Sequence, residues 1–176
     1  CGYGRTGRMF ASEAVGVTPD IITLGKAMAG GFPMSAIVST QKIMSEWHPG
    51  MHGTTFGGHP VAAAAALAVL DEYEESHILE HCNQMGDYLN SRLLELAAKY
   101  PVIGDVRGIG LMRAVEFVHQ DGSPAGDIFS ALRQYCQDHG LLVLGCGVYG
   151  NGLRFATPLN ITKEDLEAGL AIFTEA

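Results

Sequence analysis

No stretch of this chain is apolar for long enough to cross a lipid bilayer. A membrane-spanning helix needs about 20 mostly apolar residues, whereas the longest uninterrupted apolar run, residues 61–70, has ten and is mostly alanine. Positive charge is also scarce, because 11 lysines and arginines face 19 acidic residues, for a formal net charge of −8. Nucleic acids and anionic membrane surfaces repel such a chain. We therefore expect no nucleic-acid partner and no membrane partner.

Cysteines are few and scattered. The four are Cys1, Cys82, Cys136 and Cys146, and no two of them form a Cys-x-x-Cys pair. This spacing favours reduced structural thiols in a cytoplasmic protein over disulfides or a zinc site. No charged leader precedes an apolar core, so no signal peptide is expected.

Metal-binding clusters are also lacking. His48 and His52, and likewise His77 and His81, have the i, i+4 spacing that two ligands on one helix need. His52 falls in a glycine-rich loop, and His77 and His81 have no further histidine nearby to complete a site. We therefore interpret them as solvated surface histidines and predict no metal site.

The composition is that of a folded protein. A hydrophobic content of 47% excludes a disordered tail. A length of 176 residues fits one domain or two small ones, and it is enough to bury a core.

The stretch from Pro19 to Pro33 carries the main chemical signal. Ile21–Leu24 is a short run rich in β-branched residues, which predicts a buried strand of a parallel sheet. Lys26 follows that strand, and open α/β sheets bind ligands at the carboxyl ends of their strands. Partial desolvation there would favour the neutral amine, which can attack an aldehyde. The alternative is a surface lysine that merely ends a strand.

The rest of the chain predicts a mixed architecture. Gly2–Gly7 spells G-x-G-x-x-G, but no strand precedes it and Asp20 lies too close for a dinucleotide site, so an irregular loop is expected. The other expected elements are a strand over 35–39, a short helix over 42–47, a loop over 49–58, a helix from Pro60 into 71–75, a long helix N-capped by Ser76, strands over 102–106 and 110–118, a helix over 127–139 ended by Gly140, strands over 141–144 and 153–156, and a last helix capped at Thr162. The second half is predicted to be a small α+β unit with an antiparallel sheet, and we place the domain boundary near residues 71–76.

Several motifs resemble one enzyme family over essentially the whole chain. They are Gly4-Arg5-Thr6-Gly7, Pro19-Asp20, Lys26, Gly30-Gly31, Thr55-Phe56, Val106–Met112, and Cys146–Asn151 leading to Arg154. In this order and spacing they resemble the class III pyridoxal-phosphate aminotransferases. Within that family the last block is most similar to the 4-aminobutyrate aminotransferases. The resemblance covers the C-terminal part of such an enzyme.

The resemblance implies a fold and a reaction. The fold would be α/β: residues 1–75 as the C-terminal part of the large cofactor-binding domain of fold type I, and residues 76–176 as the small α+β C-terminal domain. An ω-amino acid such as 4-aminobutyrate would give its amino group to 2-oxoglutarate, through a Schiff base between Lys26 and pyridoxal 5'-phosphate. Lys26 would then act as the base that moves the proton.

Two further site residues follow from the same resemblance. Thr55 would contact the cofactor phosphate of a neighbouring subunit, which implies a homodimer or a higher homo-oligomer. Arg154 would bind the α-carboxylate of amino and oxo acid substrates, because a guanidinium matches a carboxylate bidentately. From the residues alone, Thr55 also fits a capping role with Thr54 as its competitor, and Arg154 also fits an ordinary surface arginine.

Two other functions remain open at this stage. The first is an ornithine or acetylornithine aminotransferase, against which the block Cys146–Asn151 argues. The second is a catalytically incomplete fragment or a binding module, because the acid that pairs with the pyridine nitrogen in this family precedes the position of Gly2. No residue-level reason gives Arg5 or Arg107 a catalytic role.

Overall fold

A computed structural model describes residues 1–176, and the chain divides into two compact units. The first unit comprises residues 1–4 and 8–79, and the second comprises residues 5–7 and 80–176. The predicted boundary lay at residues 75 and 76, shortly before this division. That residues 1–75 and 76–176 belong to two domains of a larger enzyme stays a prediction. None of the helices combines the length and the apolar character that crossing a membrane requires.

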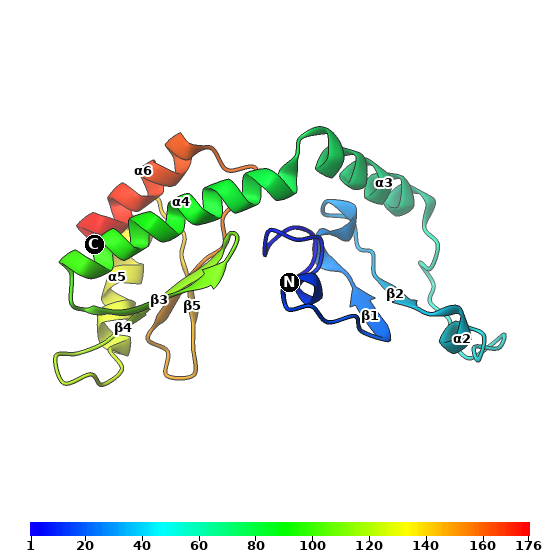
Figure 1. Ribbon diagram of the computed structural model, residues 1–176, viewed down its shortest axis with the longest axis horizontal. Coiled ribbons are helices and arrows are strands. Elements are labelled where there is room, and N and C mark those ends of the chain that lie inside the picture. The colour runs from blue at the N-terminus through cyan, green and yellow to red at the C-terminus, as the bar shows by residue number, and fades with distance from the viewer. The chain divides into compact units, whose positions relative to one another are not determined.

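The first unit consists of short elements followed by one long helix (Figure 1). In chain order they are α1 (Ala11–Ala14), β1 (Ile21–Leu24), the 3₁₀ turn η1 (Lys26–Ala29), β2 (Ala36–Ser39), α2 (Gln41–Met44) and α3 (Pro60–Glu75). Residues 3–6 form turns and residue 7 lies in a bend, as the irregular-loop prediction requires.

The strand β1 is not a buried strand of a parallel sheet, so that prediction was wrong. In this chain β1 pairs antiparallel with β2 alone, with Ile21 opposite Ser39 and Leu24 opposite Ala36. Its residues alternate between exposed and half-buried. The reason is that a β-branched apolar run specifies a strand but not the direction of its partner. The strand expected over 35–39 is observed as β2.

Helix α3 begins where its sequence predicts. Pro60 occupies its first turn, where a missing N–H costs nothing, and the His59 side chain caps it by accepting a hydrogen bond from the Ala62 amide at 3.3 Å. Ser76 is the C-cap of α3 and not the N-cap of the next helix, so that prediction was wrong. Its backbone is near-helical and its hydroxyl donates backward to Glu72, whereas an N-cap needs an extended backbone and an accepting hydroxyl.

The second unit is a four-stranded sheet packed with three helices. Its elements are α4 (Ile78–Lys99, whose first two residues belong to the first unit), β3 (Ile103–Ile109), β4 (Met112–Phe117), α5 (Gly126–Asp138), β5 (Leu144–Cys146), β6 (Gly152–Phe155) and α6 (Lys163–Glu175). The strand order is β3-β4-β6-β5 and every pairing is antiparallel, which confirms the predicted type of sheet.

The cluster of buried hydrophobic side chains lies within this second unit. On α4, Cys82, Leu89 and Leu93 are fully buried and face this core. Strands β4 and β6 and helices α5 and α6 contribute most of the remaining core side chains. Phe129 of α5 is buried there too.

The strand predicted over 141–144 begins later, at Leu144. Residue 141 is not free to start it, because its amide still bonds a carbonyl in the last turn of α5. Gly140 has φ +86°, and its amide donates to the carbonyl of Gln137 at 3.2 Å. The amide of Leu141 donates to the carbonyl of Cys136 at 2.8 Å. These two bonds form a Schellman motif, which confirms Gly140 as the residue that ends the helix.

Candidate active site

Lys26 lies directly after β1 and opens η1. Its φ of +54° places it in the left-handed region, which residues other than glycine rarely adopt and which is frequent at functional sites. Its Nζ atom makes no hydrogen bond or ion pair. The residue is exposed in this chain, so the predicted partial desolvation is not present here. The 176 residues thus present a primary amine with no partner on a strained backbone.

Helix α3 supports the turn that carries Lys26. Ala29, the last residue of η1, is fully buried, and η1 packs against α3. Gly30 follows with φ +59°, and a Cβ atom there would lie 3.1 Å from Cγ2 of Val69 on α3. The chain therefore turns back toward β2 in close contact with α3, which holds η1 and hence the backbone of Lys26.

Thr55 lies in the exposed turn before α3. Neither its hydroxyl nor that of Thr54 makes a hydrogen bond, although the Thr54 carbonyl accepts one from the Gly57 amide at 3.2 Å. Phe56 is 77% exposed, and its ring meets the His59 ring edge-on. The cap of α3 is supplied by His59, which removes the capping role that Thr55 had as an alternative. Its role toward a phosphate stays a prediction.

Arg154 lies in the middle of β6, in register with Ala114 of β4 and with Leu144 of β5. Its side chain is exposed and makes no hydrogen bond or ion pair, so the guanidinium is free to bind a ligand. It lines a largely apolar cavity of about 400 Å³ between the β5–β6 edge and α6, together with Asp165 and apolar side chains such as Leu144, Phe155 and Leu170. It is the single basic residue of that lining.

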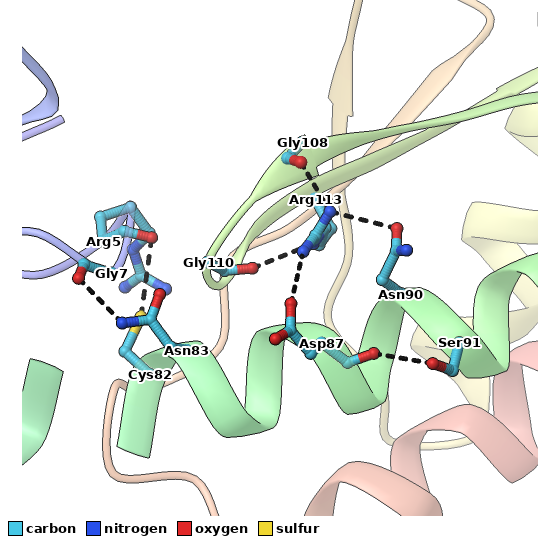
Figure 2. A network of polar contacts seen from close by, with 10 residues as sticks. All are labelled: Arg5, Gly7, Cys82, Asn83, Asp87, Asn90, Ser91, Gly108, Gly110 and Arg113. Carbon is cyan, nitrogen blue, oxygen red and sulfur yellow. Dashed lines mark hydrogen bonds and ion pairs between the residues drawn. The ribbon is translucent and has the colours of Figure 1, made fainter. Parts of the chain in front are cut away.

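Two other arginines of the second unit, Arg107 and Arg113, are engaged in structural contacts. Arg107 bonds Glu116 and Asp105, and these bonds raise the pKa of its guanidinium. Arg113 is buried, and burial lowers its pKa. Its guanidinium donates to the carbonyls of Gly108 and Gly110 and to Asn90 Oδ1, and it lies 3.6 Å from Asp87 Oδ1 (Figure 2).

Arg5 was not assigned a role from the sequence, yet the structure gives it a place. Its Nη1 atom donates to the carbonyl of Thr157 at 2.6 Å, just beyond the strand that carries Arg154, and to the carbonyl of Leu111 at 3.4 Å. The only sequence signal was its place between two glycines in a G-x-G-x-x-G stretch. That signal could not reveal acceptors so distant in the sequence.

Two of the histidines that were considered as metal ligands contact protein groups instead. His81 lies 2.8 Å from the carbonyl of Ile161, and His52 packs against the ring of Trp47. No group of three or more histidine, cysteine or acidic residues is arranged to hold a metal ion. The four cysteines are free, with Cys82 and Cys136 buried.

The candidate residues belong to separate parts of the chain. Lys26 and Thr55 are in the first unit, where no hydrogen bond joins them, and Arg154 is in the second. The fold and the residues together define a lysine-bearing hairpin unit followed by an α+β unit with a free arginine on its sheet.

Comparison with known proteins identifies the family. The sequence profile of the aminotransferase class-III family matches residues 1–176, and the chain belongs to this family. It is 43% identical to a 5-aminovalerate aminotransferase of Pseudomonas aeruginosa and 40% identical to a 4-aminobutyrate aminotransferase of Escherichia coli, over 99% of this chain and 41% of each relative. The crystal structure of an acetylornithine aminotransferase from Elizabethkingia anophelis superposes with a TM-score of 0.86 at 35% identity, over 99% of this chain and 44% of that one. The chain therefore spans about two fifths of the length of these relatives.

Class III aminotransferases depend on pyridoxal phosphate, and the residues present here fit that cofactor. The cofactor has an aldehyde and a phosphate. Lys26 offers a primary amine without a protein partner, and Thr55 offers a hydroxyl without one in a glycine-flanked turn. The fold, with its sheets and helices, corresponds to part of the fold type I architecture of these enzymes.

Proposed function

We propose that the protein to which these 176 residues belong transfers an amino group from a linear ω-amino acid, such as 4-aminobutyrate, to 2-oxoglutarate. The proposal depends chiefly on Lys26: in a chain of the class III family, a partner-free amine follows β1 on a left-handed backbone. The free thiols favour the cytoplasm as the place of this reaction.

Lys26 is proposed to hold the cofactor and to move the proton. When bound, pyridoxal phosphate acts as an electron sink for the bond that breaks at the substrate carbon. Lys26 would hold the cofactor through its amine, because the cofactor carries an aldehyde. Its nitrogen would accept the proton from the substrate carbon beside the amine.

Thr55 and Arg154 are proposed to hold the two anionic ends of the reactants. The Thr55 hydroxyl donates to the cofactor phosphate of a neighbouring subunit, which makes the functional unit at least a dimer. The Arg154 guanidinium, which has no competing acidic partner in this chain, binds the α-carboxylate of glutamate and 2-oxoglutarate by two parallel hydrogen bonds. This contact orients the substrate carbon toward the reacting centre.

The relatives differ in the amino-group donor that their names specify. The names of two relatives specify 5-aminovalerate and 4-aminobutyrate, which are unbranched acids with a terminal amine. The name of the third specifies acetylornithine, which carries an acylated amine beside its carboxylate. The block Cys146–Asn151 favours the first kind, and an ornithine or acetylornithine donor is the second candidate.

A donor panel tests this choice in the full-length protein. We measure kcat/KM for 4-aminobutyrate, 5-aminovalerate, ornithine and acetylornithine, with 2-oxoglutarate as the common acceptor. One of the two linear ω-amino acids should exceed acetylornithine by about tenfold or more, a difference of roughly 1.4 kcal/mol. A preference for acetylornithine or ornithine establishes the second candidate. No transfer from any of the four donors contradicts both.

A further inference from the structure

The ladder between β4 and β6 has an open end, and Arg5 lies across it. The last pair of this antiparallel ladder is Arg113 with Phe155. Continuing the same register by two residues brings Leu111 opposite Thr157, where no backbone pairing is formed. The carbonyls of these two residues are the ones that Nη1 of Arg5 contacts, at 3.4 Å and 2.6 Å. One guanidinium therefore closes the ladder where its backbone hydrogen bonds stop.

The loop that carries Arg5 is itself held firmly in the second unit (Figure 2). The Asn83 side chain of α4 donates to the Gly7 carbonyl at 3.0 Å, and Cys82 Sγ lies 3.8 Å from the Arg5 carbonyl. The loop also rests backbone against backbone on the β3–β4 turn, because a Cβ atom on Gly110 would lie 2.6 Å from the Thr6 carbonyl carbon. Arg5 thus extends from a fixed base.

Arg154 depends on its strand for position because no side chain holds it. It makes no hydrogen bond or ion pair, and β6 is only four residues long, from Gly152 to Phe155. On its N-terminal side the strand is held at Asn151, whose side chain donates to the Phe117 carbonyl at 2.8 Å. On its C-terminal side the corresponding attachment is the bond from Arg5 to Thr157, three residues after Arg154.

We propose that Arg5 is a positioning residue for Arg154: its guanidinium bonds the carbonyls of Leu111 and Thr157 across the open end of the β4–β6 ladder, and so fixes the strand that presents the carboxylate-binding arginine. The inference rests on the proposed function of Arg154. An arginine suits the task because the N–H groups of Nη1 are fixed in the plane of the guanidinium, whereas the three donors of a lysine ammonium rotate on a flexible stem.

The test uses the full-length, cofactor-loaded enzyme with Arg5→Met, Arg5→Lys and a matched control, Arg133→Met. Arg133 is exposed on α5 of the same unit and makes no hydrogen bond or ion pair. The first readout is the affinity for glutarate, a five-carbon dicarboxylate that cannot react, measured by calorimetry. The second is kcat/KM for glutamate and for 4-aminobutyrate, which differ only in the carboxylate on the reacting carbon.

Arg5→Met should weaken glutarate binding about tenfold or more and should lower kcat/KM for glutamate, with 4-aminobutyrate changed less than about twofold. Arg5→Lys should retain part of the affinity, and Arg133→Met should match the unmodified enzyme. Deuterium exchange of the peptide over residues 152–158 should rise in Arg5→Met. Equal losses for glutamate and 4-aminobutyrate, or no loss of glutarate affinity, would overturn the proposal. If Arg5→Met does not load the cofactor, the same comparison in Arg5→Lys decides.

A double substitution distinguishes the proposed positioning role of Arg5 from the proposed carboxylate-binding role of Arg154. If Arg5 acts through Arg154, adding Arg5→Met to Arg154→Lys should change glutarate affinity less than about twofold. If Arg5→Met lowers glutarate affinity as much in the Arg154→Lys enzyme as in the unmodified enzyme, the positioning role of Arg5 is overturned. If Arg154→Lys alone keeps full glutarate affinity, the proposed function of Arg154 fails instead, whatever Arg5→Met does.

Discussion

Lys26 combines two properties that seldom occur together: a left-handed backbone and an amine without a partner. The other lysines are Lys42, Lys99 and Lys163. Lys42 lies in α2, while the amines of Lys99 and Lys163 lie over the rings of Tyr100 and Tyr88, 4.9 Å and 4.5 Å from their centroids. The strained position of Lys26 has no packing role of its own, which is typical of a residue kept for function.

We predict that Lys26 is the one lysine to which the cofactor binds covalently. The cofactor-loaded, full-length enzyme is reduced with borohydride, digested, and searched by mass spectrometry for the peptide that retains the pyridoxyl group. The label should be found on Lys26 alone. A label on Lys42, Lys99 or Lys163 would contradict the assignment.

Arg154→Lys should lower kcat/KM about 10²-fold or more for glutamate and 2-oxoglutarate. The lysine keeps the charge but loses the two parallel hydrogen bonds, and charge-assisted bonds contribute roughly 1.5–3 kcal/mol each, so a loss near 3 kcal/mol is reasonable. The fold and the binding of the cofactor should survive, because Lys26 belongs to the other unit.

An amine without a carboxylate provides the control for this substitution. Nothing on such a donor engages the guanidinium, so its turnover should change far less. Equal losses for donors with and without a carboxylate would mean that Arg154 is structural.

At the scale of elements, three backbone segments of the second unit meet at glycines. A Cβ atom on Gly86 of α4 would lie 2.3 Å from the Gly110 carbonyl oxygen, and one on Gly110 would lie 2.7 Å from the Gly7 amide nitrogen. Backbone atoms cannot move aside as flexible side chains can. The helix, the β3–β4 turn and the Arg5 loop are thus packed at a distance that only glycine allows.

Gly86→Ala should therefore destabilise the protein, although alanine is the better helix former. The propensity gain is about 1 kcal/mol, whereas overpacking against backbone costs about 1–3 kcal/mol or more. We expect a net loss of about 1–2 kcal/mol, seen as a lower midpoint in urea unfolding.

Gly169→Ala on α6 is the matched control for the same measurement. A Cβ atom there would lie 3.4 Å from the end of the Leu141 side chain, an ordinary contact. The control should keep or slightly raise the midpoint. A midpoint for Gly86→Ala at or above that of the unmodified protein would show that the segments can separate without cost.

For the molecule as a whole, the two units differ in how much apolar surface they cover. The buried hydrophobic cluster lies in the second unit. Large apolar side chains of the first unit remain exposed, among them Ile21, Phe32, Val38, Trp47, Phe56 and Leu67. Because exposed apolar surface of this extent promotes association, the 176-residue chain by itself should self-associate or be poorly soluble.

Light scattering over a range of concentrations checks this expectation. A monodisperse monomer of the 176-residue chain at every concentration would contradict it. The full-length enzyme should be at least a dimer, because Thr55 is proposed to serve the site of a neighbouring subunit. Activity from a full-length monomer in sedimentation analysis would contradict that assembly.

Local signals in the sequence were enough to predict most of the elements. Pro60 begins α3, Gly140 ends α5, and Thr162 caps α6 by accepting a hydrogen bond from the Asp165 amide at 3.1 Å. Such signals work because a cap or a turn depends on residues only a few positions apart. The antiparallel sheet followed from short strands separated by turns. Lys26, Thr55 and Arg154 were likewise recognised from motifs that occupy short stretches.

What the tertiary structure alone decided are the contacts between distant residues. Arg5 and Thr157 are 152 positions apart, and no periodicity or spacing links them. The pairing direction of β1 was also hidden, because an apolar run looks the same beside a parallel or an antiparallel partner. In both cases the stabilising free energy comes from contacts between groups that only folding brings together. The sequence therefore determined the elements and the candidate residues. The tertiary structure decided which strands pair and where the Arg5 guanidinium lies.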